Sequence, residues 1–468
     1  MRIYNYISIC SSLIVLSLIL ILNHELLILL ILPLVYLFSK IVFSLIKNSN
    51  IKYTKFIFDI YGFIRLVVIP ACIALFNDKQ IDNLPLGIDY FDKGVLLICI
   101  EYIVGAIFLL IFSSYRFKKN KIDHEKFTDY RLLGNKFVYI LFILISLVLF
   151  LLLPSVRETV SFLIIKTDAT GRGTEEASSL IVLVRMCIQL SLLLLFVITS
   201  LHYYKKYLKN NKLTYIIIPL IIGLLNISLI VGERRTIQLY TLISILVITS
   251  LLFKRHKLKI NMLITIVGIF ILILMTLYKE LYIFNFNSYS EALESKAVSN
   301  VKFVDQLQSY FYGPHNVGAS INYLNYYAGS IKEFFYDIVR STSGLNIFVN
   351  KDGLITSQLF NKLIYGNQQL TGHLISSAGY GYIYLGPILF PLILIFNITL
   401  AIITENLVRR TNKLEIIFIG TFVYMRIATN IFGNPMPIIS MLSSTIFVYG
   451  AVVLIAYLFK NIKTKVLI

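Results

Sequence analysis

FVYILFILISLVLFLLL, residues 137–153, contains no charged side chain, and the basic stretch RFKKNKIDHEKFTDYRLLGNK, residues 116–136, directly precedes it. An apolar run of this length approaches the ~20 residues that cross a bilayer as a helix. Apolar runs and short basic clusters alternate through most of the 468 residues, of which 57% are hydrophobic. The mean hydropathy of +0.80 is unusual for a soluble domain. We therefore predict an all-α polytopic integral membrane protein.

The apolar runs predict about 12 transmembrane helices in a single membrane domain over residues 1–468. Turn signals separate neighbouring runs, for example GNPMP at residues 433–437. The first run lacks a small-residue cleavage site, so we expect a retained anchor rather than a removed signal peptide. The predicted spans are 4–22, 26–46, 56–76, 94–114, 137–153, 180–201, 213–231, 236–253, 260–278, 386–406, 415–433 and 438–459.

The distribution of basic residues orients these spans. Every second loop is rich in Lys and Arg, as in KKYLKNNK at 205–212, KRHKLK at 254–259 and RRTNK at 409–413. Cytoplasmic loops of membrane proteins hold such an excess. We therefore expect both termini in the cytoplasm and the opposite set of loops outside, namely 77–93, 154–179, 232–235 and 279–385. Because the basic clusters sit between apolar runs, the net charge of +19 does not indicate a nucleic-acid partner.

One external loop, residues 279–385, is far longer than the others and holds 12 of the chain's 31 tyrosines. A Tyr ring stacks on the apolar face of a sugar while its hydroxyl bonds to sugar hydroxyls. We expect Tyr312, Tyr380 and Tyr382 to bind sugar. Interfacial anchoring is the alternative for each Tyr, because the chain has no Trp to serve at the membrane surface.

The long external loop has an internal pattern of its own. VKFVDQLQSYF at 301–311 and SIKEFFYDIVR at 330–340 combine helical apolar spacing with a polar face. We expect short amphipathic helices there, lying at the membrane interface or dipping into it. Three stretches cluster Gly, Ser and Asn and are predicted to be loop-like, namely GPHNVGAS at 313–320, STSGLN at 341–346 and YGNQQLTGH at 365–373.

Two external histidines, His373 and His315, are suited to proton transfer near neutral pH. A structural hydrogen-bonding role is the alternative for each. Further candidate bases are Asp305, Asp337 and Glu333. The two histidines lack a short ligand spacing, and the four cysteines lie inside predicted spans without a CxxC pattern. We therefore expect neither a metal site nor another cofactor.

Several cations are predicted in the outer half of the bilayer or just above it. Arginine offers a planar fork for bidentate contact with phosphate, and a lipid-linked diphosphate would lie at this depth. Pairing with Glu101 or Glu233, or snorkelling to headgroups, is the alternative, and it explains Arg185 and the deeper Arg65 equally well. The candidate diphosphate ligands are Arg185, Arg234, Arg235, Arg426, Lys279 and Arg340.

Together these features resemble the Wzy-type polymerases of O-antigen and capsular polysaccharide. Two short motifs carry the resemblance beside the architecture. One is the Gly-x-Arg-like turn Gly232-Glu233-Arg234-Arg235 at an outer helix junction. The other is the Gly/aromatic run that closes the long loop, which contains Gly372, His373, Ser376, Ser377, Gly379, Tyr380, Tyr384 and Gly386. Many family members place a Glu in the second run, and this chain has none there.

The resemblance implies a polyprenyl-diphosphate-linked oligosaccharide as substrate, in the plasma (inner) membrane of a bacterium. The growing glycan would pass to the non-reducing-end hydroxyl of a new repeat unit, and polyprenyl diphosphate would leave. Arg234 and Arg235 would stabilise the leaving group, with His373 as first and His315 as second candidate base. The lipid bilayer is an expected partner, together with a chain-length regulator and a flippase.

Three other functions remain open. A lipid-linked oligosaccharide flippase shares the span number and basic charge, but we expect internal two-fold similarity and short external loops in it. An O-antigen ligase uses the same donor and a different acceptor. A transferase of single sugars from polyprenyl donors commonly has an acidic pair in a large first external loop, and here that loop is only NHE at 23–25.

Overall fold

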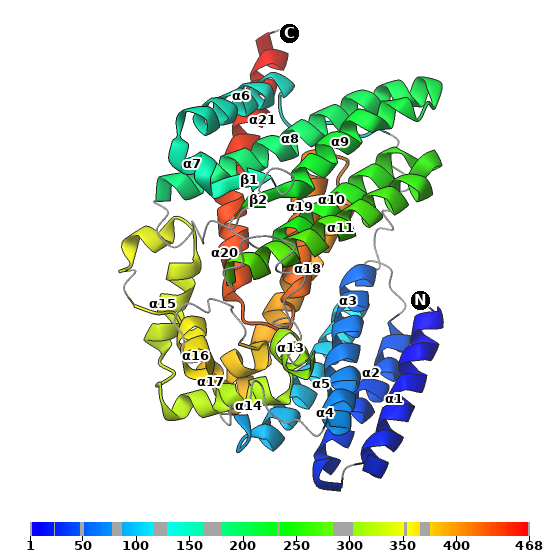
Figure 1. Ribbon diagram of the computed structural model, residues 1–468, viewed down its shortest axis with the longest axis vertical. Coiled ribbons are helices and arrows are strands. Elements are labelled where there is room, and N and C mark those ends of the chain that lie inside the picture. Colours follow the sequence, from blue (N-terminus) through cyan, green and yellow to red (C-terminus); the bar gives the residue numbers. More distant parts are fainter. Residues whose placement is uncertain are drawn as a thin grey trace. The chain divides into compact units, whose positions relative to one another are not determined.

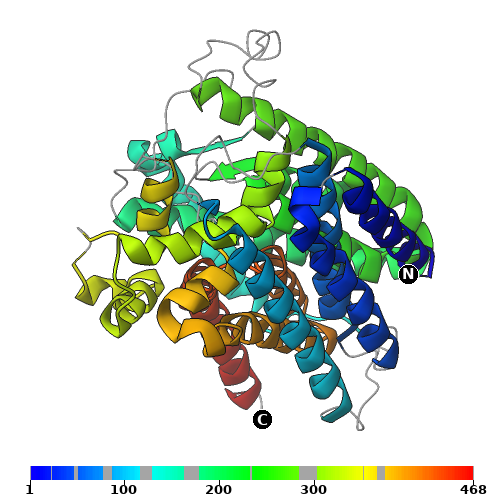
Figure 2. The same ribbon diagram turned by 90° about the horizontal axis from the view of Figure 1, so that it is seen from below.

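The computed structural model describes residues 2–22, 24–46, 51–76, 87–115, 129–162, 179–231, 235–283, 303–350, 353–365 and 375–466. Within these ranges the regular structure is helical apart from one ladder of two short strands and isolated bridges. Figures 1 and 2 show the helices in two views. The predicted all-α class is confirmed.

The chain divides into two compact units. Unit 1 comprises Met1–Lys121, Ala297–Asn406 and Arg426–Ser443, and unit 2 comprises Ile122–Lys296, Leu407–Met425 and Ser444–Ile468. The helices that belong mainly to unit 1 are α1 (Arg2–Leu22), α2 (Ile31–Leu45), α3 (Lys52–Phe63), the π-turn η3 (Ile64–Val68), α4 (Ile69–Phe76), α5 (Phe91–Tyr115), α13 (Phe303–Tyr310), α14 (Pro314–Asn322), α15 (Ile331–Ser341), α16 (Thr356–Tyr365), α17 (Ser377–Leu389), α18 (Leu392–Arg409) and α20 (Met436–Thr445).

Unit 2 is built mainly from helical hairpins, α8 with α9 and α10 with α11. A ladder pairs β1 with β2 antiparallel, with Val160 opposite Val231 and Phe162 opposite Leu229. Its elements are α6 (Lys136–Leu152), α7 (Pro154–Thr159), β1 (Val160–Phe162), α8 (Ser179–Asn210), α9 (Thr214–Ser228), β2 (Leu229–Val231), α10 (Arg235–Leu252), α11 (Lys257–Ile283), α19 (Leu414–Thr429) and α21 (Ala451–Val466).

Seven described helical segments are long and apolar enough to cross a membrane. An eighth arises if the bent pair Thr236–Leu252 and Lys254–Ile271, which turns by 115°, counts as one span. The chain is thus a multi-pass membrane protein, and each predicted span overlaps a helix. The count of about 12 and the orientation stay predictions. The seven segments are Ile3–Leu22, Leu26–Leu45, Lys52–Phe76, Phe91–Ser113, Ile181–Asn210, Leu392–Arg409 and Met436–Lys460.

Three local predictions differ from the structure. GPHNVGAS lies mostly in the buried helix α14, because Pro314 suits the first helical turn and small residues allow close packing. The predicted span 213–231 ends as a helix at Ser228 and continues as β2. The predicted span 386–406 begins later, at Leu392, because Gly386 adopts φ 73° and breaks α17.

Helix α14 fits closely between α5 and α17 because glycines line the contacts. A Cβ atom on Gly94 of α5 would meet the Pro314 carbonyl, and one on Gly379 of α17 would meet Ser320. Close helix approach through small residues is typical of packing inside membranes. This packing brings part of the long loop 279–385 into the interior of unit 1.

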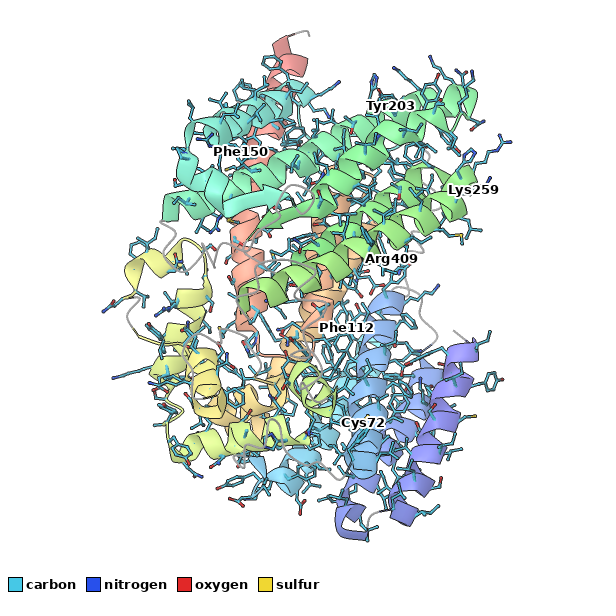
Figure 3. All side chains as sticks on the ribbon, viewed as in Figure 1. Cys72, Phe112, Phe150, Tyr203, Lys259 and Arg409 are labelled. Carbon is cyan, nitrogen blue, oxygen red and sulfur yellow. The ribbon has the colours of Figure 1, made fainter. Side chains whose placement is uncertain are left out.

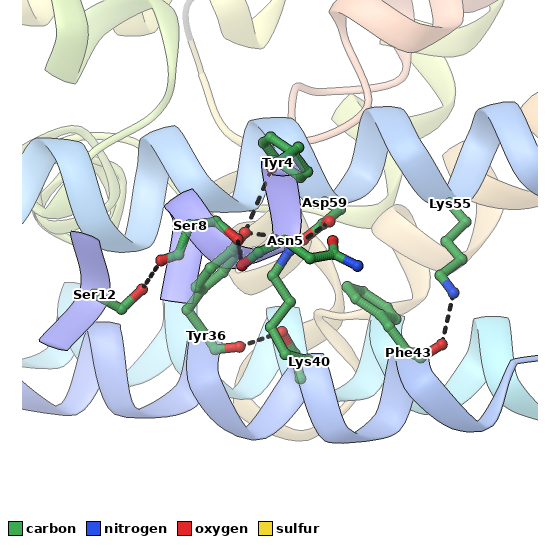
Figure 4. A network of polar contacts seen from close by, with 10 residues as sticks. Tyr4, Asn5, Ser8, Ser12, Tyr36, Lys40, Phe43, Lys55 and Asp59 are labelled. Carbon is green, nitrogen blue, oxygen red and sulfur yellow. Dashed lines mark hydrogen bonds and ion pairs between the residues drawn. The ribbon is translucent and has the colours of Figure 1, made fainter. Parts of the chain in front are cut away.

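A polar network joins α1, α2 and α3 within unit 1 (Figure 4). The Asp59 carboxylate accepts hydrogen bonds from the Tyr36 hydroxyl at 3.0 Å and from Lys40 Nζ at 2.7 Å. The Lys40 ammonium also lies over the rings of Tyr4 and Tyr36. Asp59 therefore has its own partners and does not pair with Arg65 on the same span.

The first turn of α3 is fixed by a carboxylate from α18. Glu405 accepts hydrogen bonds from the backbone N–H groups of Tyr53 (3.1 Å) and Thr54 (2.9 Å) and from the Thr54 hydroxyl (2.7 Å). Helix N-termini leave N–H groups without intrahelical partners, and a carboxylate there also meets the positive end of the helix dipole. Glu405 thus joins two candidate spans that are far apart in the sequence.

We expect Glu405→Ala to lower the free energy of unfolding by about 1–3 kcal/mol, because three buried or half-buried donors lose their acceptor. Thermal unfolding of the detergent-solubilised protein measures the effect. The matched control is Asn406→Ala, since the Asn406 amide, within the described residues, donates to the Ile402 carbonyl of its own helix and to no other element. Equal unfolding midpoints for the two variants would contradict the capping role.

Two basic loops of unit 2 lie at the same end of its helical hairpins. Figure 3 shows Tyr203 on α8 and Lys259 on α11 at this end. The hydroxyl of Tyr207 and Nδ1 of His256 are 2.9 Å apart, which joins the 205–212 and 254–259 segments directly. The positive-inside assignment requires these two loops on one side of the membrane, and this contact agrees with it.

A third and a fourth basic segment meet within unit 2 as well. Arg131 and Lys413 form a parallel backbone bridge, which joins the loop before α6 to the loop before α19. The Lys460 ammonium of α21 donates to the Leu132 carbonyl at 2.9 Å. An edge-to-face contact between the rings of Tyr130 and Tyr204, with ring centres 6.3 Å apart, connects this group to α8. These basic segments of unit 2, which were predicted to share a side of the membrane, thus contact one another within the unit.

Candidate functional site

A buried ion pair lies among the candidate spans of unit 1. Arg65, on the π-turn η3, places Nη1 2.5 Å from Glu101 Oε2 of α5. The two side chains are only 1% and 0% exposed. Arg65 Nε donates to the Tyr312 carbonyl at 2.9 Å, and its guanidinium lies 5.0 Å from the centre of the Phe432 ring. The structural alternative, pairing of an arginine with Glu101, is confirmed for Arg65.

The second oxygen of Glu101 accepts a hydrogen bond from the Ser377 hydroxyl, at the first turn of α17. The Ser377 backbone N–H donates to the Phe432 carbonyl at 2.8 Å. Ser376 caps α17 by accepting from the Gly379 N–H at 2.9 Å. The first turn of α17 is therefore fixed to a charge inside a candidate span. We call Arg65, Glu101, Ser377 and the Tyr312 carbonyl the arginine–glutamate cluster.

The turn between α19 and α20 completes this region. The Tyr312 hydroxyl donates to Asn430 Oδ1 at 3.2 Å, and the Asn430 amide donates to the Asn434 carbonyl at 2.7 Å. Asn434 N–H in turn donates to the Ile375 carbonyl at 3.0 Å. Tyr312 itself has φ 56°, a backbone conformation that non-glycine residues rarely adopt. Sequence reasoning did not select Asn430, although an Asn beside an apolar run is a signal for such a role.

A second polar cluster lies farther along α17, in the long loop. Asp337 of α15 accepts from the Tyr380 hydroxyl at 3.0 Å and from the Thr356 N–H at 3.1 Å. The Thr356 and Tyr384 hydroxyls share a further hydrogen bond. We call Asp337, Thr356, Tyr380 and Tyr384 the carboxyl–tyrosine cluster. It is enclosed by apolar and aromatic neighbours that include Phe334, whose ring centre is 5.4 Å from that of Tyr384.

The environment of this cluster changes proton affinity. Burial raises the pKa of the Asp337 carboxyl above its ordinary value, and hydrogen bonds from Thr356 and Tyr380 oppose the rise. Burial likewise raises the pKa of the Tyr380 and Tyr384 hydroxyls, and the nearby Asp337 adds to that rise. The tyrosines therefore remain proton donors, whereas the carboxyl can take up a proton at a higher pH than an exposed Asp.

Helix α17 connects the two clusters. Ser377, Tyr380 and Tyr384 follow one another at spacings of three and four residues, so they share one face of the helix. Ser377 reaches Glu101, Tyr380 reaches Asp337 and Tyr384 reaches Thr356. A displacement of α17 would therefore act on both clusters.

The candidate base His315 lies on α14 and is fully buried. Its ring Nε2 accepts a hydrogen bond from the Gly87 N–H at 3.3 Å, and the backbone N–H of His315 donates to Gln308 Oε1 at 3.2 Å. These contacts are those of the structural alternative, and a catalytic role stays a prediction. His373 and Asp305 cannot be compared with it, because His373 and the side chain of Asp305 lie outside the described residues.

The predicted diphosphate ligands are distributed over both units. Arg185 belongs to unit 2 and is 6% exposed, and its Nε and Nη1 have no hydrogen-bond partner among the described residues. Arg426, half-buried, donates to the Pro437 carbonyl at 3.5 Å. Arg340 donates to the Tyr336 hydroxyl at 2.6 Å and to the Gly353 carbonyl.

Three further predicted ligands are only partly described. Arg234 lies outside the described residues, and Arg235 and Lys279 lie on α10 and α11 with side chains that are not described.

The three predicted sugar ligands have different surroundings. Tyr380 is fully buried and Tyr312 is 5% exposed, whereas Tyr382 is half-buried and packs against the apolar core of unit 1. No group of three or more His, Cys, Asp or Glu side chains capable of holding a metal ion occurs in the described part of the chain.

Comparison with protein-family models, curated proteins and solved structures finds no match for this chain. The hydropathy and the length of the helices assign the chain to a broad class. The chain is a multi-pass helical membrane protein.

Proposed function

We propose that this protein polymerises polyprenyl-diphosphate-linked oligosaccharide repeat units into O-antigen or capsular polysaccharide. The reaction takes place on the outer face of the bacterial plasma membrane. In it, the bond between the anomeric carbon of the growing glycan and its diphosphate breaks, and the glycan moves en bloc to a hydroxyl of a new repeat unit. Polyprenyl diphosphate leaves, and no cofactor takes part.

One observation carries the proposal. Helix α17 joins a charged pair in the candidate spans to a buried carboxyl in a Tyr-rich segment that the charge pattern predicts to be external. A transferase with a lipid-anchored donor and a glycan acceptor needs both elements, a frame in the bilayer and a polar aromatic site next to it. Because the Arg65 and Glu101 side chains are buried, we assign them to holding α17 rather than to contacting substrate.

The contacts favour Asp337 over His315 as the proton acceptor. The Thr356 side chain forms a hydrogen bond with Asp337, and its hydroxyl shares another with the hydroxyl of the half-buried Tyr384. These hydroxyls offer a route for a proton from the edge of the cluster to the carboxyl. The acceptor hydroxyl would lose its proton along this route as the new glycosidic bond forms. Arg234 and Arg235 keep the role expected from the sequence, which is to stabilise charge on the leaving diphosphate.

Deletion of the gene followed by glycan analysis tests the function itself. Single repeat units on the lipid carrier or at the cell surface support a polymerase. Polymer that accumulates on the carrier would instead identify a ligase, and repeat units trapped on the cytoplasmic face would identify a flippase. Complementation with Arg234→Ala or Arg235→Ala should fail to restore polymer, and full polymer from both variants would remove these residues from the mechanism.

A further inference from the structure

Two short helical segments of the long loop expose large apolar side chains. Ile331 and Phe335, one helical turn apart on α15, are 60% and 58% exposed. Three more lie in the following 3-10 turn η9, Leu345–Phe348, where Ile347 and Phe348 are 76% and 82% exposed and Leu345 is 49% exposed. We call these five side chains the apolar patch. Folded proteins rarely leave such a group in water without a binding function.

The patch is not the face by which α15 joins unit 1. The buried side of α15 carries Asp337, with Phe334 and Ile338 packed into the cluster around Tyr380. A capping box at Ser330 and Glu333 fixes the start of the helix. The exposed apolar side chains therefore project from a helix that is already held in place, so burying α15 in the protein interior does not explain them.

A hydrogen bond connects the patch to a candidate membrane span. The Ser343 N–H, between α15 and η9, donates to the Ser443 hydroxyl at 2.9 Å. Ser443 belongs to the segment Met436–Lys460 and lies seven residues from its start, which is about 10 Å along the helix axis. Gly344, with φ 93°, then turns the chain into η9. The η9 part of the patch therefore begins two residues after Ser343, which contacts the first third of a candidate span.

Charge next to the patch gives no preference for an acidic partner. Lys332 and Glu333 are both exposed on α15, and Arg340 is engaged by Tyr336 and Gly353. Apolar and aromatic side chains with mixed charge beside them fit the boundary between headgroups and acyl chains. We propose that the apolar patch inserts into this boundary of the bilayer, on the side where Met436 begins its span, so that α15 and η9 form an interfacial anchor.

The anchor does not depend on the proposed enzymatic function. Because the chain has no Trp, a single introduced Trp reports its own surroundings. Phe348→Trp and Phe335→Trp place the probe in the patch, and Lys362→Trp places it at an exposed polar position on the neighbouring helix α16. Each full-length variant is reconstituted in phosphatidylcholine nanodiscs with brominated or unbrominated acyl chains, and Trp emission is recorded with and without iodide.

We expect brominated lipid to remove most of the emission of Phe348→Trp and Phe335→Trp, and iodide to have little effect on them. Lys362→Trp should show the reverse. Iodide quenching of both patch variants at the level of Lys362→Trp would overturn the proposal. So would protection from both quenchers, because a protein surface, such as a second copy of the chain, would then cover the patch. If one of the two patch substitutions impairs folding, the other still provides the test.

Discussion

Arg65→Met is expected to prevent the protein from accumulating in its folded form. The substitution leaves the Glu101 carboxylate in a buried site without its cation, and loss of one partner of a buried ion pair costs about 3–5 kcal/mol. It also removes the donor to the Tyr312 carbonyl. The amount of monodisperse protein after detergent extraction, together with its unfolding midpoint, measures the effect. Arg157→Met, an equivalent change at an exposed arginine, should leave both values near those of the parent protein.

The double variant Arg65→Met/Glu101→Gln distinguishes the effect of one unpaired buried charge from the effect of replacing both side chains. Since neither uncompensated charge remains, the double variant should be more stable than Arg65→Met alone, and the two single effects should not add. If the double variant loses as much unfolding free energy as the two single variants together, Arg65 and Glu101 do not act as a pair.

Asp337→Asn should abolish polymer formation without destabilising the protein at neutral pH. If Asp337 accepts the proton of the acceptor hydroxyl, its loss should lower the rate by about 10²–10⁴-fold. Asn keeps the size of the side chain and an oxygen that can accept from Thr356 and Tyr380. Polymer synthesis from purified lipid-linked repeat units measures the rate. Asp89→Asn, the same change at an exposed aspartate outside the cluster, should keep its activity.

The same variant has a defined stability signature. Burial raises the pKa of Asp337 in the folded protein, so the folded state binds this proton more tightly than the unfolded state does. The protonated Asp337 carboxyl therefore contributes fully to the free energy of unfolding below the ordinary Asp pKa. This contribution is lost as the pH rises through the raised pKa of the folded state. Asn cannot ionise, so the unfolding midpoint of Asp337→Asn should fall less than that of the parent as the pH rises above the ordinary Asp pKa of about 3.9. Equal pH profiles, or normal polymer from Asp337→Asn, would argue against the assigned role.

Hydropathy and charge predicted the elements that one stretch of chain specifies by itself. The run 137–153 became α6 within a residue at each end, and SIKEFFYDIVR became the capped helix α15. The buried Asp337 also left a signal, because it follows Phe334 by three residues on the apolar side of that helix. The meeting of the basic loops of unit 2 followed from the same charge pattern.

Features that depend on distant partners could not be predicted in this way. GPHNVGAS has the composition of a loop, and it is helical because glycines on α5 and α17 leave room for it. The pairing of Ser377 with Glu101 joins residues 276 positions apart, and no local pattern specifies it. The strands β1 and β2 stabilise one another across a long stretch of sequence, whereas 229–231 alone reads as the end of a span.

The π-turn at Ile64–Val68 amounts to one residue inserted into an otherwise α-helical span. An extra residue rotates everything beyond it by about 100° relative to an uninterrupted helix. Asp59, before the turn, faces Lys40 and Tyr36, and Arg65, within it, faces Glu101. Deleting one residue from this turn would restore regular winding and swing α4 around its axis. The one inserted residue therefore lets two charged side chains of the same candidate span, Asp59 and Arg65, bind different partners.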